Sequence, residues 1–263
     1  MAEKPLQGKV ALVTGSSRGI GRAIALKLGS LGAWVFVNYV RSEDEAREVV
    51  AQLEAMGSGG AALKADMGDL DAVQQMFERV REQRGELHIL VNSAARGLQR
   101  PRSAMASLPN HLRNTFEVNV LGPWFAAKAA VPLMERGGGG AIVNMTSLGA
   151  QRYMPSYAAV GVTKGALDTL TRYLAVELAP KNIRVNGVCP SWVEETSGVT
   201  ALPDAYGEAL RQASPAGRYV TPQDVANVVA WLCGPESEMI IGQNIIIDGG
   251  LTLVGVLGVP PRD

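Results

Sequence analysis

The stretch VALVTGSSRGIG, residues 10–21, decides the fold. Its first four residues, Val10 to Val13, are all apolar, as is typical of a strand buried on both faces of a sheet. The next eight contain three glycines and lead directly into an amphipathic segment. Glycines let a backbone turn tightly and approach a phosphate, whose charge is favoured by the amides and dipole of a helix N-terminus. The stretch therefore predicts a strand, a phosphate-binding turn and a helix in direct succession.

Similar apolar runs recur along the whole chain, with longer amphipathic segments between them. The runs have the length and composition of buried strands, and the segments between them carry apolar residues at helical spacing. This alternation predicts an α/β fold, a doubly wound parallel sheet of the Rossmann type with helices on both faces. The expected strands are residues 10–13, 34–37, 61–64, 89–91, 141–145, 183–188 and 244–247, and the clearest expected helices are residues 20–31, 43–56 and 70–83.

The chain of 263 residues shows no linker between two halves and no internal repeat, so residues 1–263 are expected to form a single domain. Residues 190–220 are irregular and rich in Pro, Gly and Ser, which favours a substrate-binding lid. Thr221 and Pro222 then predict the start of another helix. The largely apolar tail, residues 251–257, is expected to be buried against another subunit rather than within its own.

The charge balance excludes some partners. Twenty-five basic and 25 acidic residues give a formal net charge of +0, which is unlike the basic surface that nucleic-acid binding requires. No apolar run is long enough to span a membrane, and the first eight residues lack the features of a secretory signal. Cys189 and Cys233 are too few for a disulfide framework and have no zinc-ligand neighbours, so no metal is expected. We therefore expect a cytoplasmic protein, with His88 a hydrogen-bonded strand histidine rather than a catalytic one.

The end of the second expected strand bears on the choice of cofactor. Dinucleotide-binding sheets that use NAD place Asp or Glu there to bind the ribose 2′-hydroxyl. Here the chain reads NYVRS, residues 38–42, with no carboxylate. Arg18 and Arg41 could bind a 2′-phosphate, and Ser42 could add a hydroxyl, although both arginines could instead be solvated surface residues. The sequence therefore favours NADPH.

Taken in order, these motifs resemble those of the short-chain dehydrogenase/reductase family over nearly the whole chain. The phosphate turn is followed by the run 92–94 after the fourth strand, Asn119 on a helix, Ser147, Lys164, and the closing run 248–250. The resemblance implies that Asp66 contacts the adenine. The full set of expected cofactor-binding residues is Gly15, Ser17, Arg18, Gly19, Ile20, Gly21, Asn38, Arg41, Ser42, Asp66, Met67, Asn92, Ala94, Lys164 and Pro190.

One position departs from the family pattern. The family usually places a catalytic tyrosine four residues before the lysine, but that residue is Val160 here, and Tyr157 stands seven before Lys164. This spacing, with the runs 92–97 and 147–164, is most similar to the NADPH-dependent third type of bacterial enoyl-acyl-carrier-protein reductase. The resemblance implies reduction of trans-2-enoyl thioesters of acyl carrier protein or coenzyme A in fatty acid synthesis. It also implies a homotetramer with long helices, residues 112–133 and 156–178, at one interface.

The spacing has a possible chemical reason. Seven residues are nearly two helical turns, so Tyr157 and Lys164 are expected on one helix face, about 10.5 Å apart along the axis instead of about 6 Å. In carbonyl reduction, the oxygen that gains charge is bonded to the carbon that takes hydride. In conjugate reduction of an enoyl thioester, hydride adds to the β-carbon and charge collects on the more distant thioester oxygen. We hypothesise that a displaced hydroxyl donor suits the second reaction.

The expected catalytic residues are Tyr157, Lys164, Ser147 and Asn119. Tyr157 would donate to the enolate oxygen, while Lys164 would bind the nicotinamide ribose and favour proton donation through its charge. Ser147 would hold substrate or an ordered water, unless its hydroxyl only caps a strand end. The resemblance implies that Asn119 supports a helix kink and a water chain, and a buried amide bonded to backbone is the alternative. Tyr153 is the rival donor, although a pocket wall is the expectation for it.

Two other functions stay open. One is a 3-oxoacyl or general carbonyl reductase that uses Tyr157 despite its spacing. The other is a non-catalytic NADPH-binding regulator, because Val160 replaces the usual acid, although the retained Tyr157, Lys164 and Ser147 argue against it. A local basic cluster, Arg96, Arg100 and Arg102, would suit docking of an acidic carrier protein or would simply be a solvated loop.

Overall fold

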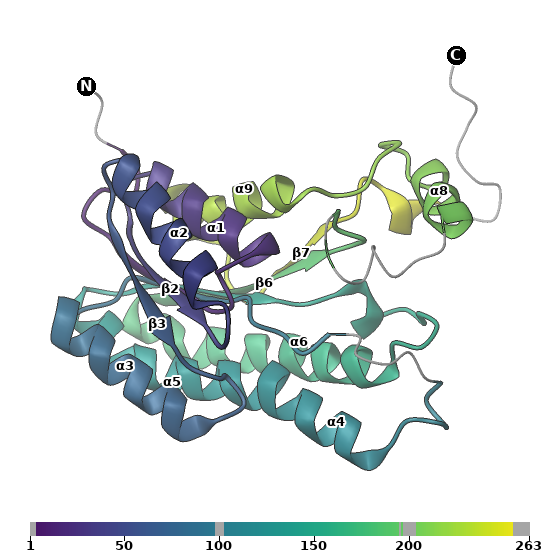
Figure 1. Ribbon diagram of the computed structural model, residues 1–263, viewed down its shortest axis with the longest axis horizontal. Coiled ribbons are helices and arrows are strands. Elements are labelled where there is room, and N and C mark those ends of the chain that lie inside the picture. The colour runs from purple at the N-terminus through teal and green to yellow at the C-terminus, as the bar shows by residue number, and fades with distance from the viewer. Residues whose placement is uncertain (1–3, 98–102, 195, 197–203, 255–263) are drawn as a thin grey trace.

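The computed structural model describes residues 4–97, 103–194, 196 and 204–254. Within these residues the chain forms a seven-stranded parallel sheet in the order β3-β2-β1-β4-β5-β6-β7 (Figure 1). Each predicted strand is present, and several extend one or two residues further. The Rossmann-type prediction is therefore confirmed. The strands are β1 Val10–Val13, β2 Trp34–Tyr39, β3 Gly60–Lys64, β4 Ile89–Asn92, β5 Gly140–Met145, β6 Ile183–Pro190 and β7 Asn244–Ile247.

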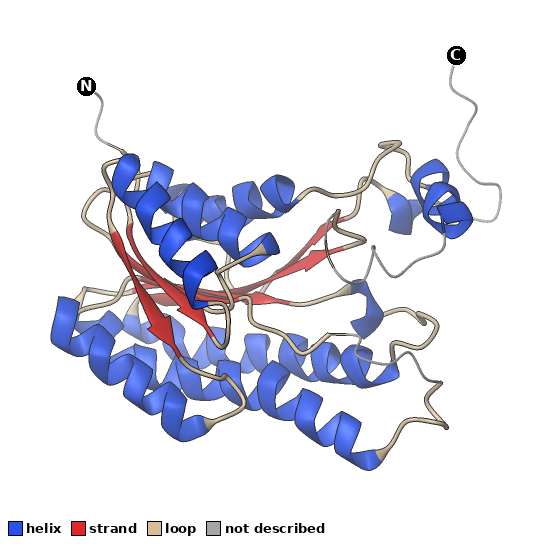
Figure 2. Cartoon of the chain, in the orientation of Figure 1, coloured by secondary structure: helices blue, strands red, loops and turns tan. Residues whose placement is uncertain are grey.

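Helices cover both faces of the sheet, as predicted (Figure 2). One face carries α1 Gly19–Ser30, α2 Glu43–Ala55 and α9 Pro222–Cys233, and the other carries α3 Leu70–Arg84, α4 Pro109–Phe116, α5 Gly122–Arg136 and α6 Ala158–Leu178. A further helix, α8 Asp204–Ala213, lies beyond the end of the sheet, close to the turn that follows β7. Among the described residues, no helix combines the length and the hydrophobicity needed to cross a membrane.

Side-chain alternation along the strands builds two apolar cores. Ala11 and Val13 of β1 pack with α1, α2 and α9, whereas Val10 and Leu12 pack with α3, α5 and α6. Successive residues of a strand point to opposite faces, so an uninterrupted apolar run serves both cores at once. From β1 the chain adds strands toward β3 on one side of the sheet, and from β4 it adds strands toward β7 on the other side. The topological switch point therefore lies between β1 and β4, and ligands of open α/β sheets bind in the crevice at such a point.

Two expected helices differ from the observed ones. The segment expected as one helix over residues 112–133 is α4, a π-helical turn over Glu117–Leu121, and α5. The helix expected from residue 156 begins at Ala158, because Ser156 has a φ of 61° and Tyr157 is the residue that precedes the helix. Since left-handed backbone cannot continue a right-handed helix, Tyr157 belongs to the loop.

The segment after β6 is held at its base. Val193 pairs with Val220 in a parallel bridge, and Thr221 caps α9 by accepting from the backbone of Asp224, as the sequence predicts. The expected lid, residues 190–220, is described only in part, since residues 195 and 197–203 lie outside the described residues. Of the expected buried tail, residues 255–257 also lie outside them, and Leu253 is 88% exposed in this chain.

Candidate active site

The phosphate turn has the tight geometry that its glycines predict. Gly15 has a φ of 62°, and a Cβ there would lie 2.9 Å from Cα of Ala94. A Cβ on Gly21 would lie 2.3 Å from the carbonyl oxygen of Gly15, so the first turn of α1 packs directly on the loop. By contrast, a Cβ on Gly19 would meet nothing within 4 Å, although its φ of 54° favours glycine. The loop is therefore closely packed at Gly15 and Gly21 and open at Gly19.

Two side chains fix this turn from below. Thr14 Oγ1 accepts from the amides of Ser93 and Ala94, both at 3.0 Å, and so joins the ends of β1 and β4. Asn38 is fully buried, and its Oδ1 accepts from Gly15 N at 2.9 Å. The Asn38 amide group also donates to Leu63 O and Ala65 O. The Asn38 side chain thus shapes the loop from inside, and any part in cofactor binding would run through Gly15.

The start of α1 fits an anion. Its N-cap, Arg18, makes no side-chain capping bond, and the first turn carries no acidic residue. The first backbone amides of the helix are therefore free of a side-chain cap, and these are the groups that bind phosphate oxygens. Ser17 is buried and Ile20 is half-buried beside them. A pyrophosphate matches this donor set, so the residues present fit the predicted dinucleotide.

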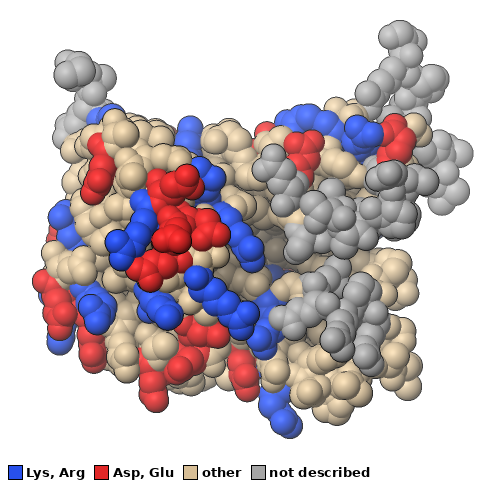
Figure 3. Space-filling view, viewed as in Figure 1, with Lys and Arg blue, Asp and Glu red and all other residues tan. Residues whose placement is uncertain are grey.

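Arg18 and Arg41 are both exposed, and Ser42 is partly exposed just before α2. Neither arginine forms an ion pair with another described residue. Figure 3 shows that this face of the molecule is hollowed near its centre and that Lys and Arg side chains gather along the border of the hollow. Both guanidinium groups are thus available to an anionic ligand.

Three further predicted cofactor contacts, Asp66, Met67 and Asn92, lie just after β3 and at the end of β4. Asp66 is exposed, and its Oδ1 accepts from Gly68 N at 2.9 Å, while Met67 is buried beside it. Asn92 is 2% exposed and donates to Asn144 Oδ1 at 2.8 Å. Among the described residues, Asn92 Oδ1 is the one buried side-chain oxygen or nitrogen without a partner. Asn92 therefore keeps one acceptor available at the end of β4.

Lys164 is the buried cation of the site. It is 5% exposed, and its Nζ donates to the carbonyl oxygen of Met145 at 2.5 Å. Burial lowers the pKa of Lys164 to about 8, and the nearby Cys189 opposes this shift weakly. That bond uses one of the three donors of the ammonium group. The other two are available for the hydroxyls of a ribose.

Tyr157 and Ser147 meet in the same region. The two hydroxyl oxygens are 3.2 Å apart, and Ser147 Oγ also accepts from Gly149 N at 3.3 Å. Burial raises the pKa of Tyr157, and the Ser147 hydrogen bond partly offsets this. The phenol is therefore neutral at physiological pH and able to donate a proton. Tyr153 is 90% exposed, so it does not wall a pocket within this chain.

Glycines make room for the Tyr157 ring. A Cβ on Gly149 would lie 2.4 Å from Cδ1 of that ring, and a Cβ on Gly161 would lie 2.5 Å from the carbonyl oxygen of Gly149. The short 3₁₀ turn Leu148–Ala150 therefore packs closely against α6, with the ring of Tyr157 on it. Val160, where the family usually has its tyrosine, is 4% exposed and cannot donate.

Asn119 lies inside the π-helical turn and is fully buried. Its Oδ1 accepts from Arg96 N at 2.8 Å, and its Nδ2 donates to Arg96 O at 3.2 Å and to Thr163 Oγ1 at 3.1 Å. Asn119 thus lies in a π-helical turn, and its amide is bonded to backbone as in the alternative reading, while a helix kink stays a prediction. A water chain through Asn119 stays a prediction, as does carrier docking at Arg96, since Arg100 and Arg102 lie outside the described residues.

Two buried residues, Cys189 and Pro190, lie at the end of β6. Pro190 is buried where β6 pairs with β7, and Cys189 before it is fully buried. Burial raises the pKa of Cys189 to about 11, so it is a protonated thiol at neutral pH rather than a nucleophile.

The structure thus brings Tyr157, Ser147 and Lys164 together around the end of β5, while Asn119 supports the loop at Arg96. Sequence reasoning assigned no role to the groups that hold them, which are the Met145 carbonyl, Gly149, Gly161 and Thr163. The pair Gly149 and Gly161 left a signal, because a glycine in a helix interior usually has a packing reason. The carbonyl of Met145 left none, since every residue has one.

Comparison with known proteins agrees with this geometry. Residues 15–252 match a family model described as "Enoyl-(Acyl carrier protein) reductase". A 1-cyclohexenylcarbonyl-CoA reductase from Streptomyces collinus is 36% identical, covering 97% of this chain and 94% of its own. A 3-oxoacyl-acyl-carrier-protein reductase from Staphylococcus aureus is 37% identical, covering 92% and 98%.

A solved structure is also similar over almost the full length. A gluconate 5-dehydrogenase from Burkholderia cenocepacia, in complex with NADP and tartrate, has a TM-score of 0.88 and 29% identity, covering 96% of this chain and 98% of its own. The sheet order, the phosphate turn and the sequence matches lead to one family. This chain belongs to the short-chain dehydrogenase/reductase family of NAD(P)-dependent oxidoreductases.

Proposed function

We propose that this protein catalyses the NADPH-dependent reduction of the carbon–carbon double bond of trans-2-enoyl thioesters carried by acyl carrier protein or coenzyme A, as in fatty acid synthesis. The observation that carries the proposal is the position of the acid. Tyr157 lies in the loop before α6, 3.2 Å from Ser147, while the usual acid position holds the buried Val160. In an enoyl thioester, the oxygen that gains negative charge is separated from the β-carbon that takes hydride. A tyrosine hydroxyl that lies further toward the loop suits this more distant oxygen.

The residues of the chain then have distinct tasks. NADPH supplies the hydride when bound. Lys164 holds the ribose with the two ammonium donors that Met145 leaves free, and its buried charge favours negative charge on the nearby substrate oxygen. Tyr157, neutral because burial raises its pKa, donates its proton to the enolate oxygen. Ser147 orients the Tyr157 hydroxyl, and residues 190–220 cover the acyl chain as a lid in this one-domain reductase.

The relatives support two chemistries on this scaffold. The Streptomyces relative is named for an unsaturated acyl-CoA, which is the substrate class proposed here. The Staphylococcus relative is named for a 3-oxoacyl thioester, and the contact between Tyr157 and Ser147 would also polarise a ketone oxygen. Reduction of 3-oxoacyl thioesters is therefore the second candidate function.

One spectrophotometric assay separates the candidates. NADPH oxidation is followed with crotonyl thioester, with acetoacetyl thioester and with no substrate. We expect crotonyl thioester to give the higher kcat/KM. Faster reduction of acetoacetyl thioester would overturn the enoyl assignment in favour of the second candidate, and NADPH binding without turnover of either would indicate a regulator.

The preference for NADPH is proposed from Arg18 and Arg41, which are exposed and make no ion pair with described residues. Arg41→Ala should weaken NADPH binding by about tenfold and leave NADH binding unchanged, because one charge-assisted contact to a phosphate is lost. Arg79→Ala on α3 is the control. Equal weakening for both nucleotides would contradict a contact to the 2′-phosphate.

A further inference from the structure

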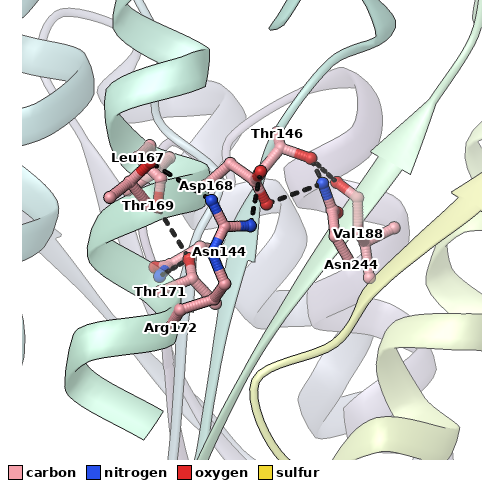
Figure 4. A network of polar contacts seen from close by, with 9 residues as sticks. All are labelled: Asn144, Thr146, Leu167, Asp168, Thr169, Thr171, Arg172, Val188 and Asn244. Carbon is pink, nitrogen blue, oxygen red and sulfur yellow. Dashed lines mark hydrogen bonds and ion pairs between the residues drawn. The ribbon is translucent and has the colours of Figure 1, made fainter. Parts of the chain in front are cut away.

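A polar bridge joins α6 to the end of β5 and to β7 (Figure 4). Thr146 Oγ1 donates to Asn244 Oδ1 at 2.9 Å, and Asn244 Nδ2 donates to Asp168 Oδ1 at 3.0 Å. Asp168 follows Lys164 by four residues on α6, so the two side chains lie on the same face of the helix. The bridge therefore starts on the helix face that carries the buried cation.

The bridge and Lys164 form a closed ring of contacts. Thr146 directly follows Met145, whose carbonyl oxygen accepts from Lys164 Nζ at 2.5 Å. The end of β5 is thus tied to α6 through Lys164, through Asn244 and Asp168, and through a third bond that Asn144 Nδ2 donates to Thr171 Oγ1 at 2.9 Å. Thr146 is 4% exposed, and its backbone amide donates to Val188 O at 2.8 Å. The peptide between residues 145 and 146 is consequently fixed from both sides.

The bridge crosses β6 at a glycine. Gly187 on β6 lies in register between Asn144 on β5 and Asn244 on β7. A Cβ at Gly187 would lie 2.7 Å from Asn244 Oδ1 and 3.4 Å from Cγ2 of Thr146. A glycine at this position is what allows the Asn244 side chain to cross β6 and reach Thr146. A side chain at residue 187 would therefore displace the Asn244 amide.

The two oxygens of Asp168 have separate partners. The inner oxygen accepts from Asn244, and the outer one pairs with Arg172 at 2.9 Å. The Asp168 side chain is 13% exposed and the Arg172 side chain is 55% exposed. Surface ion pairs of this kind contribute little, so the inner contact carries the connection to the sheet. Arg172 therefore offers a matched control that disturbs the same carboxylate from outside.

We propose that Asp168 and Asn244 are positioning residues that hold Lys164. Their bridge sets the separation between α6 and the peptide 145–146, and this separation fixes where Nζ presents its free donors. The inference rests on the role of Lys164 in the proposed function, and it applies equally to reduction of a double bond or of a ketone. Neither residue touches the substrate or the cofactor in this scheme.

The test compares NADPH dissociation constants, kcat and melting temperatures among single variants. Asp168→Ala and Asn244→Ala should each lower kcat about tenfold and weaken NADPH binding several-fold, since Lys164 loses its fixed position. Asp168→Asn keeps an oxygen acceptor for Asn244 and should recover most of kcat. Arg172→Ala should stay within twofold of the parent chain. Equal losses in Asp168→Ala and Arg172→Ala would overturn the proposal.

A double-mutant cycle separates positioning from general stability. If Asp168 acts through Lys164, adding Asp168→Ala to Lys164→Met should leave the residual kcat unchanged, because the group being positioned is already gone. A further tenfold loss in the double variant would overturn the proposal. Where a variant melts too low for assay, Asn244→Ser at lower temperature supplies the same comparison through its NADPH dissociation constant.

The substrate preference of the parent chain and the position of Lys164 are measured separately. All variants are assayed with whichever thioester the parent chain reduces faster, so the identity of that substrate reports only on the proposed function. Should the parent chain bind NADPH without reducing either thioester, the NADPH dissociation constants alone decide the inference. Unchanged binding in both Asp168→Ala and Asn244→Ala would then contradict it.

Discussion

At the scale of single residues, the site combines a neutral acid with a cation of lowered pKa. Tyr157 keeps its proton because burial raises its pKa, and its hydroxyl is oriented by Ser147. Lys164 is fixed on the Met145 carbonyl, and burial lowers its pKa to about 8. Groups with shifted pKa values that share a cleft are typical of catalytic sites. Each of the two residues can therefore be tested by a measurement of its own.

Tyr157→Phe should lower kcat about 10²-fold or more, because it removes the proton donor, while the NADPH dissociation constant stays within twofold. Tyr153→Phe is the matched control, since that side chain is 90% exposed and should leave kcat within twofold. Full activity in Tyr157→Phe would move the proton donor to another residue. Steady-state kinetics and fluorescence titration with NADPH measure both quantities.

The pKa of Lys164, lowered by burial to about 8, predicts a pH dependence of NADPH binding. Below this pH the ammonium is charged and binds the ribose. As pH rises through 8 the charge is lost, so affinity should fall, by up to about tenfold per pH unit above the pKa. Lys164→Arg stays charged and should show no such fall. An identical fall in both proteins would remove Lys164 from the binding site.

At the scale of elements, Tyr157, the proposed acid, lies in the loop 148–157 and not in the helix. Gly149→Ala should lower kcat about 10²-fold, because the new Cβ would lie 2.4 Å from the Tyr157 ring and displace it. Gly165→Ala on α6 is the control, since its nearest neighbour is 3.8 Å away. It should retain activity and raise the unfolding free energy by up to about 1 kcal/mol. Activity retained in Gly149→Ala would mean that the ring position is not critical.

The same elements show what the sequence can and cannot predict. Strand positions followed from uninterrupted apolar runs such as residues 10–13, and the phosphate turn followed from its glycines. The start of α6 did not, because nothing local requires the left-handed backbone at Ser156, whose φ is 61°. Likewise, Asn119 could be placed on a helix, yet its contacts with Arg96 and Thr163 depend on tertiary packing.

At the scale of the whole molecule, a hydrogen bond between His88 and β1 makes the stability of the fold depend on pH. Its Nδ1 accepts from Val10 N at 3.1 Å, which requires an unprotonated nitrogen, and burial lowers its pKa. A lowered pKa means that this contribution to stability is complete above the unfolded value of about 6.5 and is lost as pH falls below it. The β1–β4 junction is therefore expected to weaken in acid.

His88→Asn keeps an acceptor oxygen without a titrating ring. Its unfolding free energy should fall less than that of the parent chain between pH 7.5 and pH 5.5, as measured by urea denaturation at both values. His111→Asn on α4 is the control and should fall as much as the parent chain. Identical losses in all three proteins would show that His88 is not the group responsible.

The bridge between Val193 and Val220 has a consequence for how this fold diversifies. Because Glu194 N donates to Val220 O and Val220 N donates to Trp192 O, the two ends of the intervening segment meet side by side. A segment whose ends meet can change in length at small entropic cost without moving the strand before it or the helix after it. We therefore expect that the segment between Glu194 and Val220 can be exchanged for that of a relative while β6 and α9 keep their places.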